Sequence, residues 1–433
     1  MAVTTEEGVV AATPSRLPML RALTLRDYRL LWVGQGISLI GDQFYYIALS
    51  WLTLQLTNSA LALGGVLTAA AVPRGVLMLF GGAISDRLSP RLLMLGSDLF
   101  RGVVVAAQAI LVLAGVAQLW QLYVLAVIFG AVDAIFYPAG GAMVPMMVPE
   151  ELRPSAAALD QITGRGSIFI GPAIAGLLIA SVGRTTGDGV AFAVDAVSFA
   201  CSAVSLVLIR AGMRAPSSRG ESDATAPGEA PGDDGILGSI VAGLRYAWTD
   251  PVLRALLVII AGIDVTANGV FGVGLPLLAR HHFTGGVAAL GAMDAAFGAG
   301  ALIGIAIAGS IAQPRKKGLV VIGVTTGFGL ASLLMPFLPN LPAALVVMVL
   351  ASIGSGLINV MLIPWLQNRT DPAMFGRVMS IVMLASIGLT PLSYAVAGWV
   401  ATANLYALFV GGGALILATA IFAGASRDVR SID

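Results

Sequence analysis

The feature that most constrains the fold of this chain is a series of continuous apolar runs that recurs along its whole length. Each run is long enough to cross a bilayer, since about 20 apolar residues in a helix span ~30 Å of hydrocarbon. Of the 433 residues, 58% are hydrophobic and 11% are charged, whereas ordinary soluble domains carry roughly 25% charged residues. The strands of a membrane β-barrel alternate polar and apolar positions, and these runs do not. The sequence therefore predicts an all-α membrane protein.

Twelve runs are expected to form transmembrane helices, in two sets of six. The first set lies at about 30–56, 60–84, 92–116, 120–147, 156–181 and 188–210, and the second at about 251–279, 286–312, 319–338, 342–368, 373–400 and 403–424. The predicted domains are an N-terminal tail (1–26), a first bundle (27–210), a linker (211–250), a second bundle (251–424) and a C-terminal tail (425–433). Much of the linker is rich in Gly, Pro, Ser and acidic residues and cannot bury a core, but its last part, 236–249, is expected to form an amphipathic helix.

A weak internal repeat indicates that the two sets are related by duplication. At an offset of 219 residues, Pro145 matches Pro364 and Pro172 matches Pro391. Parallel repeats of this kind place a substrate site near the midplane, between the halves.

The distribution of Lys and Arg predicts the orientation, because cytoplasmic loops carry an excess of these residues. If both termini lie on one side, 19 of the 24 Lys and Arg fall on that side, and Arg184 and Arg280 fall opposite. We therefore expect both termini and the linker in the cytoplasm, with the chain in the cytoplasmic membrane of a bacterium.

One strongly charged loop interrupts the first hundred residues, with the sequence GGAISDRLSPR from Gly81 to Arg91. It resembles the loop 2–3 signature of the major facilitator superfamily, which runs G-x-x-x-D-R-x-G-R-R/K. The positions that match are Gly82, Asp86, Arg87 and Arg91, while Ser89 and Pro90 replace the usual Gly-Arg. Within that superfamily, the stretches LRDYRLLWVGQGISLIGDQFYYIAL and PEELRPSAAALDQI resemble the drug exporters that include macrolide efflux proteins and the enterobactin exporter.

The resemblance implies two six-helix bundles that rock about a central cavity in alternating access. It implies that the loop latches the cytoplasmic side, and Asp86 would then meet the positive N-terminal end of the eleventh helix, where Arg377 lies. The fifth helix reads GRGSIFIGPAIAG and resembles the Gly-Pro signature of the antiporter branch, with Gly171, Pro172 and Gly176 in place. Together with Pro391, these residues are candidate hinges.

Several carboxyl groups are expected inside the membrane, where a charge needs a partner or a water-filled cavity. Counting about 1.5 Å per residue from the cytoplasmic ends, Asp42, Asp133 and Asp264 come near the midplane. They are the candidates for proton coupling, and Asp42 is preferred because it lies midway along the first helix. The alternative for Asp42 is a structural hydrogen bond to a neighbouring helix.

Polar and aromatic residues near these depths are candidates for the lining of a substrate cavity. They are Gln43, Tyr45, Tyr46, Arg74, Phe136 and Asn268. Arg101 and Asp133 lie on adjacent helices at similar depths, so a buried ion pair is expected, because burying either charge alone is costly. A proton relay between the two is the alternative.

These features favour proton-coupled export of an amphipathic small molecule, with the proton motive force and no cofactor. The chain has no G-x-x-x-x-G-K-[ST] motif, since its lysines are Lys316 and Lys317, and this excludes a P-loop ATPase. The single cysteine, Cys201, excludes an intrachain disulfide, and His281 and His282 are a weak metal signal, so no metal is expected. A siderophore exporter and a solute-importing symporter remain open. A membrane enzyme or lipid scramblase is remote, and we expect a monomer in the lipid bilayer with no nucleic-acid partner.

Overall fold

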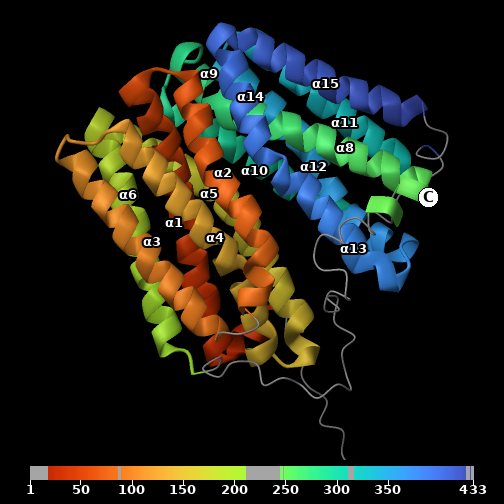
Figure 1. Cartoon of the computed structure of the whole chain (residues 1–433), viewed down its shortest axis with the longest axis horizontal. Coiled ribbons are helices and arrows are strands. Elements are labelled where there is room, and N and C mark those ends of the chain that lie inside the picture. Colours follow the sequence, from red (N-terminus) through yellow and green to blue (C-terminus); the bar gives the residue numbers. More distant parts are fainter. Residues whose placement is uncertain are drawn as a thin grey trace, which may run out of the picture.

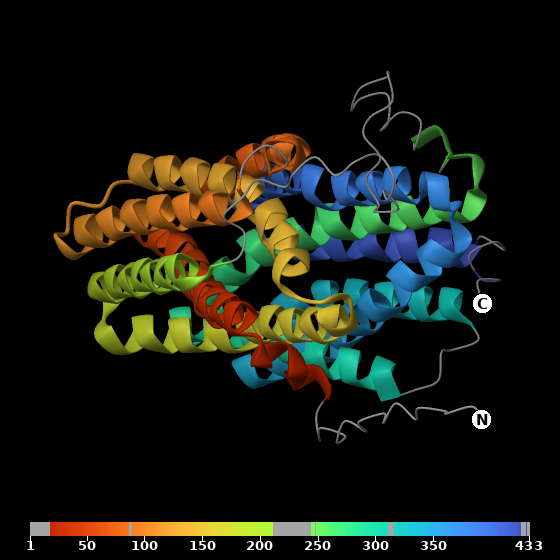
Figure 2. The same cartoon turned by 90° about the horizontal axis from the view of Figure 1, so that it is seen from below.

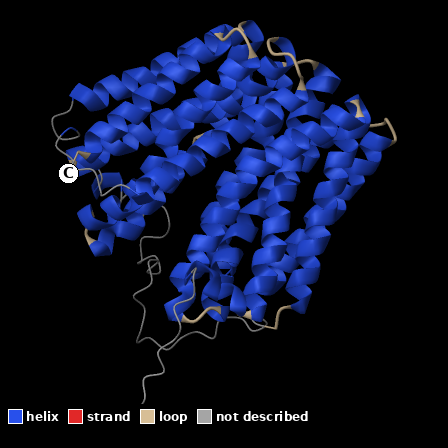
Figure 3. Cartoon of the chain, turned by 180° about the vertical axis from the view of Figure 1, so that it is seen from behind, coloured by secondary structure: helices blue, strands red, loops and turns tan. Residues whose placement is uncertain are grey.

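The computed structural model describes residues 18–85, 89–210, 244–246, 248–310, 316–425 and 430. Every regular element in these ranges is a helix, and no strand occurs among them (Figure 3). The predicted all-α fold is therefore confirmed. Most of the expected tails and of the expected linker, including the start of its amphipathic helix, lies outside the described residues.

The first set of helices follows the predicted runs closely. A short 3-10 helix η1 (Pro18–Thr24) leads into α1 (Arg26–Thr57), α2 (Ala60–Ser85), α3 (Pro90–Leu113), α4 (Leu119–Met147), a turn η2 (Glu150–Leu152), α5 (Arg153–Val182) and α6 (Arg184–Leu208). Asn58 ends α1 in the left-handed conformation, with φ of 50°, and this permits the sharp turn into α2.

Two membrane crossings of the second set are interrupted by π-helical turns. The first crossing consists of α8 (Pro251–Gly269), η3 (Val270–Gly274) and α9 (Leu275–His281), and it is followed by α10 (Val287–Ser310) and α11 (Lys317–Leu334). After the turn η4 (Met335–Phe337) come α12 (Leu341–Arg369), α13 (Pro372–Met383), η5 (Leu384–Gly388), α14 (Thr390–Ala403) and α15 (Leu405–Ala425). The π-helical turns are η3 and η5.

Eleven helical segments of the described chain are long and apolar enough to cross a membrane. The helix α1 is not among the eleven, and it adds the twelfth crossing because its 32 residues exceed the ~20 that a bilayer requires. Its lower hydropathy comes from inward-facing polar residues such as Gln35, Asp42 and Gln55. Six crossings precede the linker and six follow it.

The two sets form two groups that meet at one end and diverge toward the other (Figures 1 and 3), and Figure 2 shows the molecule from the diverging end. We call the diverging end the linker end, where α1 begins at Arg26 and α6 ends at Leu208. The other is the far end, where α1 ends at Thr57 and α2 begins at Ala60. The repeat-related prolines lie on equivalent helices, since Pro145 is in α4 and Pro364 in α12.

The groups are joined by a seam in which glycines let helix backbones touch. On one side of the seam α5 packs on α10, and an ideal Cβ added at Gly176 would lie 3.0 Å from the Gly291 Cα. On the other side α2 packs on α14, and a Cβ at Gly64 would lie 2.8 Å from the Gly398 Cα. The hydroxyl of Thr68 in α2 also donates to the Pro391 carbonyl oxygen at 3.2 Å.

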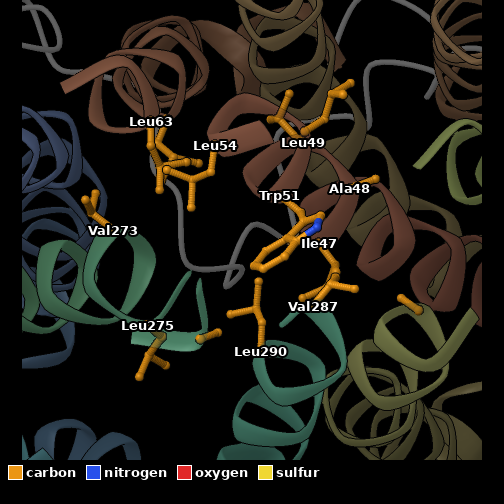
Figure 4. Close-up of a cluster of buried hydrophobic side chains, with 14 of the residues drawn as sticks. Ile47, Ala48, Leu49, Trp51, Leu54, Leu63, Val273, Leu275, Val287 and Leu290 are labelled. Carbon is orange, nitrogen blue, oxygen red and sulfur yellow. The ribbon is translucent and has the colours of Figure 1, made fainter. Parts of the chain in front are cut away.

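Apolar packing seals the far end between the groups. Trp51 of α1 points toward Val287 and Leu290 of α10 (Figure 4), and all three belong to one buried cluster that runs through both groups. Arg280 of α9 donates to the Asn58 side-chain oxygen at 2.9 Å and stacks over Trp51. The two groups are therefore packed against each other at the far end and diverge toward the linker end (Figure 1).

Candidate functional site

The site begins with a cavity of about 190 Å³ inside the first group of helices. Four helices supply its walls: α1, α3, α4 and α5. The lining residues are Leu31, Trp32, Gln35, Ser38, Leu39, Asp42, Met94, Phe136, Gly140, Gly141, Val144, Asp160 and Thr163. The lining combines apolar and aromatic surface with two carboxyl groups, one amide and two hydroxyls. It contains no Lys or Arg.

Asp42 is the deep carboxyl group of this cavity. Its residue is 9% exposed, and its Oδ1 has no hydrogen-bond partner among the described residues. A buried carboxyl oxygen without a partner is energetically expensive, so this atom is available to a ligand, a water molecule or a proton. The structure therefore places the preferred coupling candidate in the wall of a cavity.

Asp160 is the second carboxyl group, and it lies one helix away on α5. The Tyr28 hydroxyl donates to Asp160 Oδ1 at 2.9 Å and lies 3.0 Å from the Ala156 carbonyl oxygen. Trp32 lies beside them in the lining, and its indole Nε1 lacks a partner among the described residues. An aromatic wall with carboxylate acceptors suits an amphipathic molecule.

A hydrogen-bonded chain connects the cavity to a buried ion cluster. Gln35 of the lining donates to Ser202 Oγ at 3.1 Å, and Ser202 donates to Asp98 Oδ2 at 2.6 Å. Asp98 Oδ1 then accepts from Arg101 Nη2 at 2.8 Å. The same guanidinium donates through Nη1 to Asp133 Oδ1, also at 2.8 Å.

Arg101 is 1% exposed, and its two terminal nitrogens are paired, whereas its Nε has no hydrogen-bond partner among the described residues. Its two carboxylate partners, Asp98 and Asp133, supply opposite charge, and the rings of Phe129, Phe136 and Phe199 stand 4.3 to 5.5 Å from its central carbon. Such geometry repays part of the cost of taking a cation out of water. The expected Arg101–Asp133 pair is thus observed, and Asp98 joins it.

Of the expected cavity residues, Phe136 lies in the lining, and the others lie elsewhere. Tyr45 is fully buried and stacks on Phe129 with ring centroids 3.9 Å apart. Gln43 packs against Gly171 of α5. Gln43 is turned about 100° from Asp42 around the axis of α1, toward α5, whereas Tyr45 lies closer to the Asp42 face and packs its ring against Phe129 of α4 instead of entering the cavity.

Two further expected cavity residues surround Asp133 instead. The Tyr46 hydroxyl lies 3.5 Å from Asp133 Oδ2, and Arg74 Nη1 lies 3.9 Å from the same oxygen. Arg74 is half-buried on α2, so Asp133 has a second cation within reach.

In the second group of helices, Asp264 and Asn268 lie together on α8. Ser386 of η5 donates to Asp264 Oδ2 at 2.7 Å. The Asn268 amide donates to the Asp264 carbonyl oxygen at 2.8 Å and approaches Thr390 Oγ1 at 3.5 Å. These contacts tie α8 to the interrupted crossing formed by α13, η5 and α14.

The expected latch is described in part. Gly82 is in the last turn of α2 and Arg377 is in the first half of α13, while Asp86 and Arg87 lie outside the described residues. Arg91 donates to the carbonyl oxygens of Leu206 and Val207 at 2.7 Å each. Arg91 therefore caps the negative C-terminal end of α6 within its own bundle.

The expected hinge residues lie at or beside the seam. Gly176 contacts Val287 and Gly291 of α10, and the Pro172 carbonyl oxygen lies against Gly291. Pro391 stands in the first turn of α14, directly after η5.

The structure also shows two buried carboxyl groups on α6 that were not among the site residues predicted from the sequence. Asp188 and Asp195 are both 0% exposed. Gln55 of α1 donates to Asp188 Oδ2 at 2.8 Å, and Ser198 lies 3.2 Å from Asp195 Oδ1. Their spacing of seven residues, which puts both on one face of a helix, was the available signal.

The Major Facilitator Superfamily model matches residues 31–388. Among known relatives, the Multidrug efflux pump Tap of Mycolicibacterium fortuitum is 28% identical over 379 residues, covering 86% of this chain and 88% of that pump. Macrolide efflux protein A of Streptococcus pyogenes is 23% identical over 423 residues, covering 93% of this chain and 96% of that protein.

Solved structures agree on the fold. The nucleoside transporter NupG matches with a TM-score of 0.67 at 10% identity, over 92% of this chain and 98% of that one. A bacterial homologue of the human lysosomal transporter Spinster, in an inward-facing and unoccupied conformation, matches with a TM-score of 0.64 at 15% identity, over 96% and 98%. At these identities the similarity concerns the fold alone.

Proposed function

The chain belongs to the Major Facilitator Superfamily, and we propose that it exports an amphipathic small molecule, such as a drug or secondary metabolite, across the cytoplasmic membrane by alternating access. The observation that carries this proposal is the cavity around Asp42. The cavity has apolar and acidic lining residues and lies inside the first helix group. At the far end, apolar packing closes the contact between this group and the other. The named efflux function of two relatives that align over most of this chain supports the same reading.

The linker end is the cytoplasmic end in this proposal, since most Lys and Arg belong to it. Both termini then lie in the cytoplasm, and the conformation described above is the one that loads substrate from inside. Export requires the seam at the far end to open while the linker end closes. Asp86 and Arg377 would meet when it closes, as the family signature implies.

The proton motive force supplies the energy in this proposal, with Asp42 as the proton carrier. Asp98 and Asp133 are held by Arg101, whereas Asp42 forms no ion pair with the described residues. Substrate and proton would then compete for the Asp42 carboxyl group in the cavity. Because binding of one releases the other, export of substrate is coupled to the inward movement of protons. In this proposal the chain transports its substrate and catalyses no chemical reaction. A single copy contains both helix groups, so the proposed transport unit is the monomer.

Uptake into inverted membrane vesicles tests the proposal. With an imposed proton gradient, wild-type vesicles are expected to accumulate ethidium, an amphipathic cation, or erythromycin, a macrolide. Asp42→Asn is expected to lose gradient-driven accumulation. A catecholate siderophore added as a third probe distinguishes the siderophore alternative.

The matched control is Asp27→Asn, the same change at the linker end of α1, which should accumulate the probe normally. If the gradient drives accumulation of none of the three probes, the export proposal fails. If Asp42→Asn accumulates the probe like the wild type at every pH, Asp42 is not the carrier.

A further inference from the structure

We propose that Asp188 and Asp195 of α6, with Asp42 of α1, form a proton path through the first helix group, from the far end to the cavity. This inference rests on the proposed proton-coupled export and names the residues that would deliver the proton. It explains how a proton reaches Asp42 while the seam between the groups is sealed at the far end.

The first support is that each of the three carboxyl groups is buried with one oxygen unpaired. Asp188 and Asp195 are 0% exposed and Asp42 is 9% exposed. Among the described residues, no hydrogen-bond partner exists for Asp42 Oδ1, Asp188 Oδ1 or Asp195 Oδ2. Native structures rarely leave buried polar atoms unpaired without a role, and these three are aligned along one pair of helices.

The second support is that none of the three carboxyl groups forms an ion pair with a Lys or Arg in the part of the chain that the structure describes. Arg101 is already paired with Asp98 and Asp133. An uncompensated carboxylate in a membrane interior is costly. A bound proton removes that charge, so these are the acids of the cluster suited to carry one.

The third support is their alignment along the contact between α1 and α6. Asp188 and Asp195 are seven residues apart, so they lie on one face of α6 at a separation of about 10 Å. Gln55 of α1 holds Asp188, and an ideal Cβ on Gly41 would lie 2.8 Å from Asp195 Oδ1. Gly41 precedes Asp42, and so Asp195 lies beside the residue that enters the cavity wall.

Aromatic side chains fill the space between Asp188 and Asp195 on this path. Phe192 lies between Asp188 and Asp195 on α6 and is 0% exposed, and the Tyr45 ring stands 6.1 Å from it. Because the ~10 Å gap exceeds the reach of a direct transfer, water must enter this contact for the path to connect. The apolar gap thus prevents a continuous leak.

The proton moves along the path through the three carboxyl groups in order. Asp188 Oδ1 accepts a proton from water at the far end, and waters that enter the ~10 Å gap pass it to Asp195 Oδ2. Asp195 passes it to Asp42 Oδ1, and Asp42 releases it to water in the cavity when substrate takes the place of the proton, as in the proposed competition. No charge other than the proton moves, so each carboxyl group returns to its starting state.

Other titratable and charged groups face this path from the packed helices. The groups that interact electrostatically with Asp42 or Asp195 are Tyr45 of α1, Arg74 of α2, Asp98 and Arg101 of α3 and Asp133 of α4. The Asp98–Arg101–Asp133 cluster stays internally paired, so its fixed charge affects the proton affinity of Asp42 and Asp195 without carrying the proton.

The test uses the full chain in proteoliposomes with a pH-sensitive dye inside and ethidium as the probe. Two quantities are measured for Asp188→Asn and Asp195→Asn: ethidium accumulation driven by a proton gradient, and ethidium exchange at equal pH on both sides. Gradient-driven accumulation is expected to fall about 100-fold or more, as for loss of a positioned proton-transfer group. Exchange is expected to stay at the wild-type rate. The matched control is Asp294→Asn on α10, which changes a membrane carboxyl group outside the path. This variant should keep both gradient-driven accumulation and exchange at the wild-type level.

If the wild type moves neither ethidium nor, in repeats of the assay, erythromycin or the catecholate siderophore, the export proposal fails rather than the path. If the wild type is driven by the gradient and either Asn variant is driven equally well, the path is wrong. If a folded Asn variant loses both ethidium exchange and gradient-driven accumulation, the path is also wrong, because the carboxyl group would then serve binding or structure. If an Asn variant does not fold, Asp188→Glu and Asp195→Glu replace it. These should keep coupled transport with a shifted pH profile, and an unshifted profile overturns the path.

Discussion

The substitution Gly291→Ala is expected to shift the molecule away from the conformation that is open at the linker end. Gly291 of α10 lies against α5 at the seam, where an added Cβ would meet the Pro172 carbonyl oxygen and lie 3.0 Å from the Gly176 Cα. Both neighbours are backbone atoms, which cannot rotate away as a side chain can. The two helices must therefore separate if the methyl group is to fit.

The size of the shift follows from the cost of overpacking. Forcing one extra carbon into a packed contact costs typically about 1–3 kcal/mol, and this cost applies only while the seam is closed. A difference of that size changes the ratio of two conformations by about 5- to 150-fold. A molecule that strongly prefers the linker-end-open form would become a mixture or reverse its preference.

The measurement is the distance between spin labels placed on the two groups at the linker end. Exposed positions such as Glu151 and Gln367 suit this purpose, in a chain whose single cysteine, Cys201, is replaced by serine. Gly291→Ala should enrich the short-distance population, in which the linker end is closed. Gly327→Ala is the matched control, because a Cβ there would meet nothing within 4 Å. An unchanged distance distribution for Gly291→Ala would refute the role of the glycine seam.

Three further predictions concern stability and gating. Arg101→Met leaves Asp98 and Asp133 buried without their cation, so the free energy of unfolding should fall by about 3–5 kcal/mol. Thermal unfolding in detergent measures the change, and a variant as stable as the wild type would contradict the argument. Partial burial disfavours the charged form of Asp250, but hydrogen bonds from Arg369 and from the Val252 N–H outweigh it and hold the pKa of Asp250 below its ordinary value of 3.8. A group whose pKa is lowered by folding stabilises the fold above its unfolded pKa and stops doing so as pH falls through the folded value. The stability difference between wild type and Asp250→Asn should therefore shrink in acid and not in alkali. Finally, Asp86→Ala should slow transport more than it weakens binding of the probe, and equal transport rates would exclude the latch.

The fold could be predicted from the sequence because the membrane imposes a local rule. A backbone in hydrocarbon must satisfy its hydrogen bonds within its own helix, so each long apolar run had to become a helix. The expected run at 60–84 became α2 (Ala60–Ser85), and that at 251–279 became α8, η3 and α9. The π-helical turns could not be predicted, since they depend on contacts across the seam rather than on local composition.

The site could be predicted only in outline. Asp42 was singled out by its depth, and the structure places it in a cavity wall. The pairing of Arg101 with Asp133 followed from the cost of burying either charge alone, but the participation of Asp98 did not. Tyr45 was expected beside substrate and is instead packed on Phe129, because the sequence does not specify how far α1 is rotated about its axis.

The sequence by itself determined that this chain is a membrane protein with two related sets of helices, and its motifs indicated the superfamily. These properties depend on run length, charge and short motifs, which are local. The tertiary structure decided which carboxyl groups share Arg101 and which remain unpaired, and it decided which glycines form the seam. Those properties depend on how helices far apart in the sequence are rotated and crossed against one another, and no single stretch of the chain contains that information.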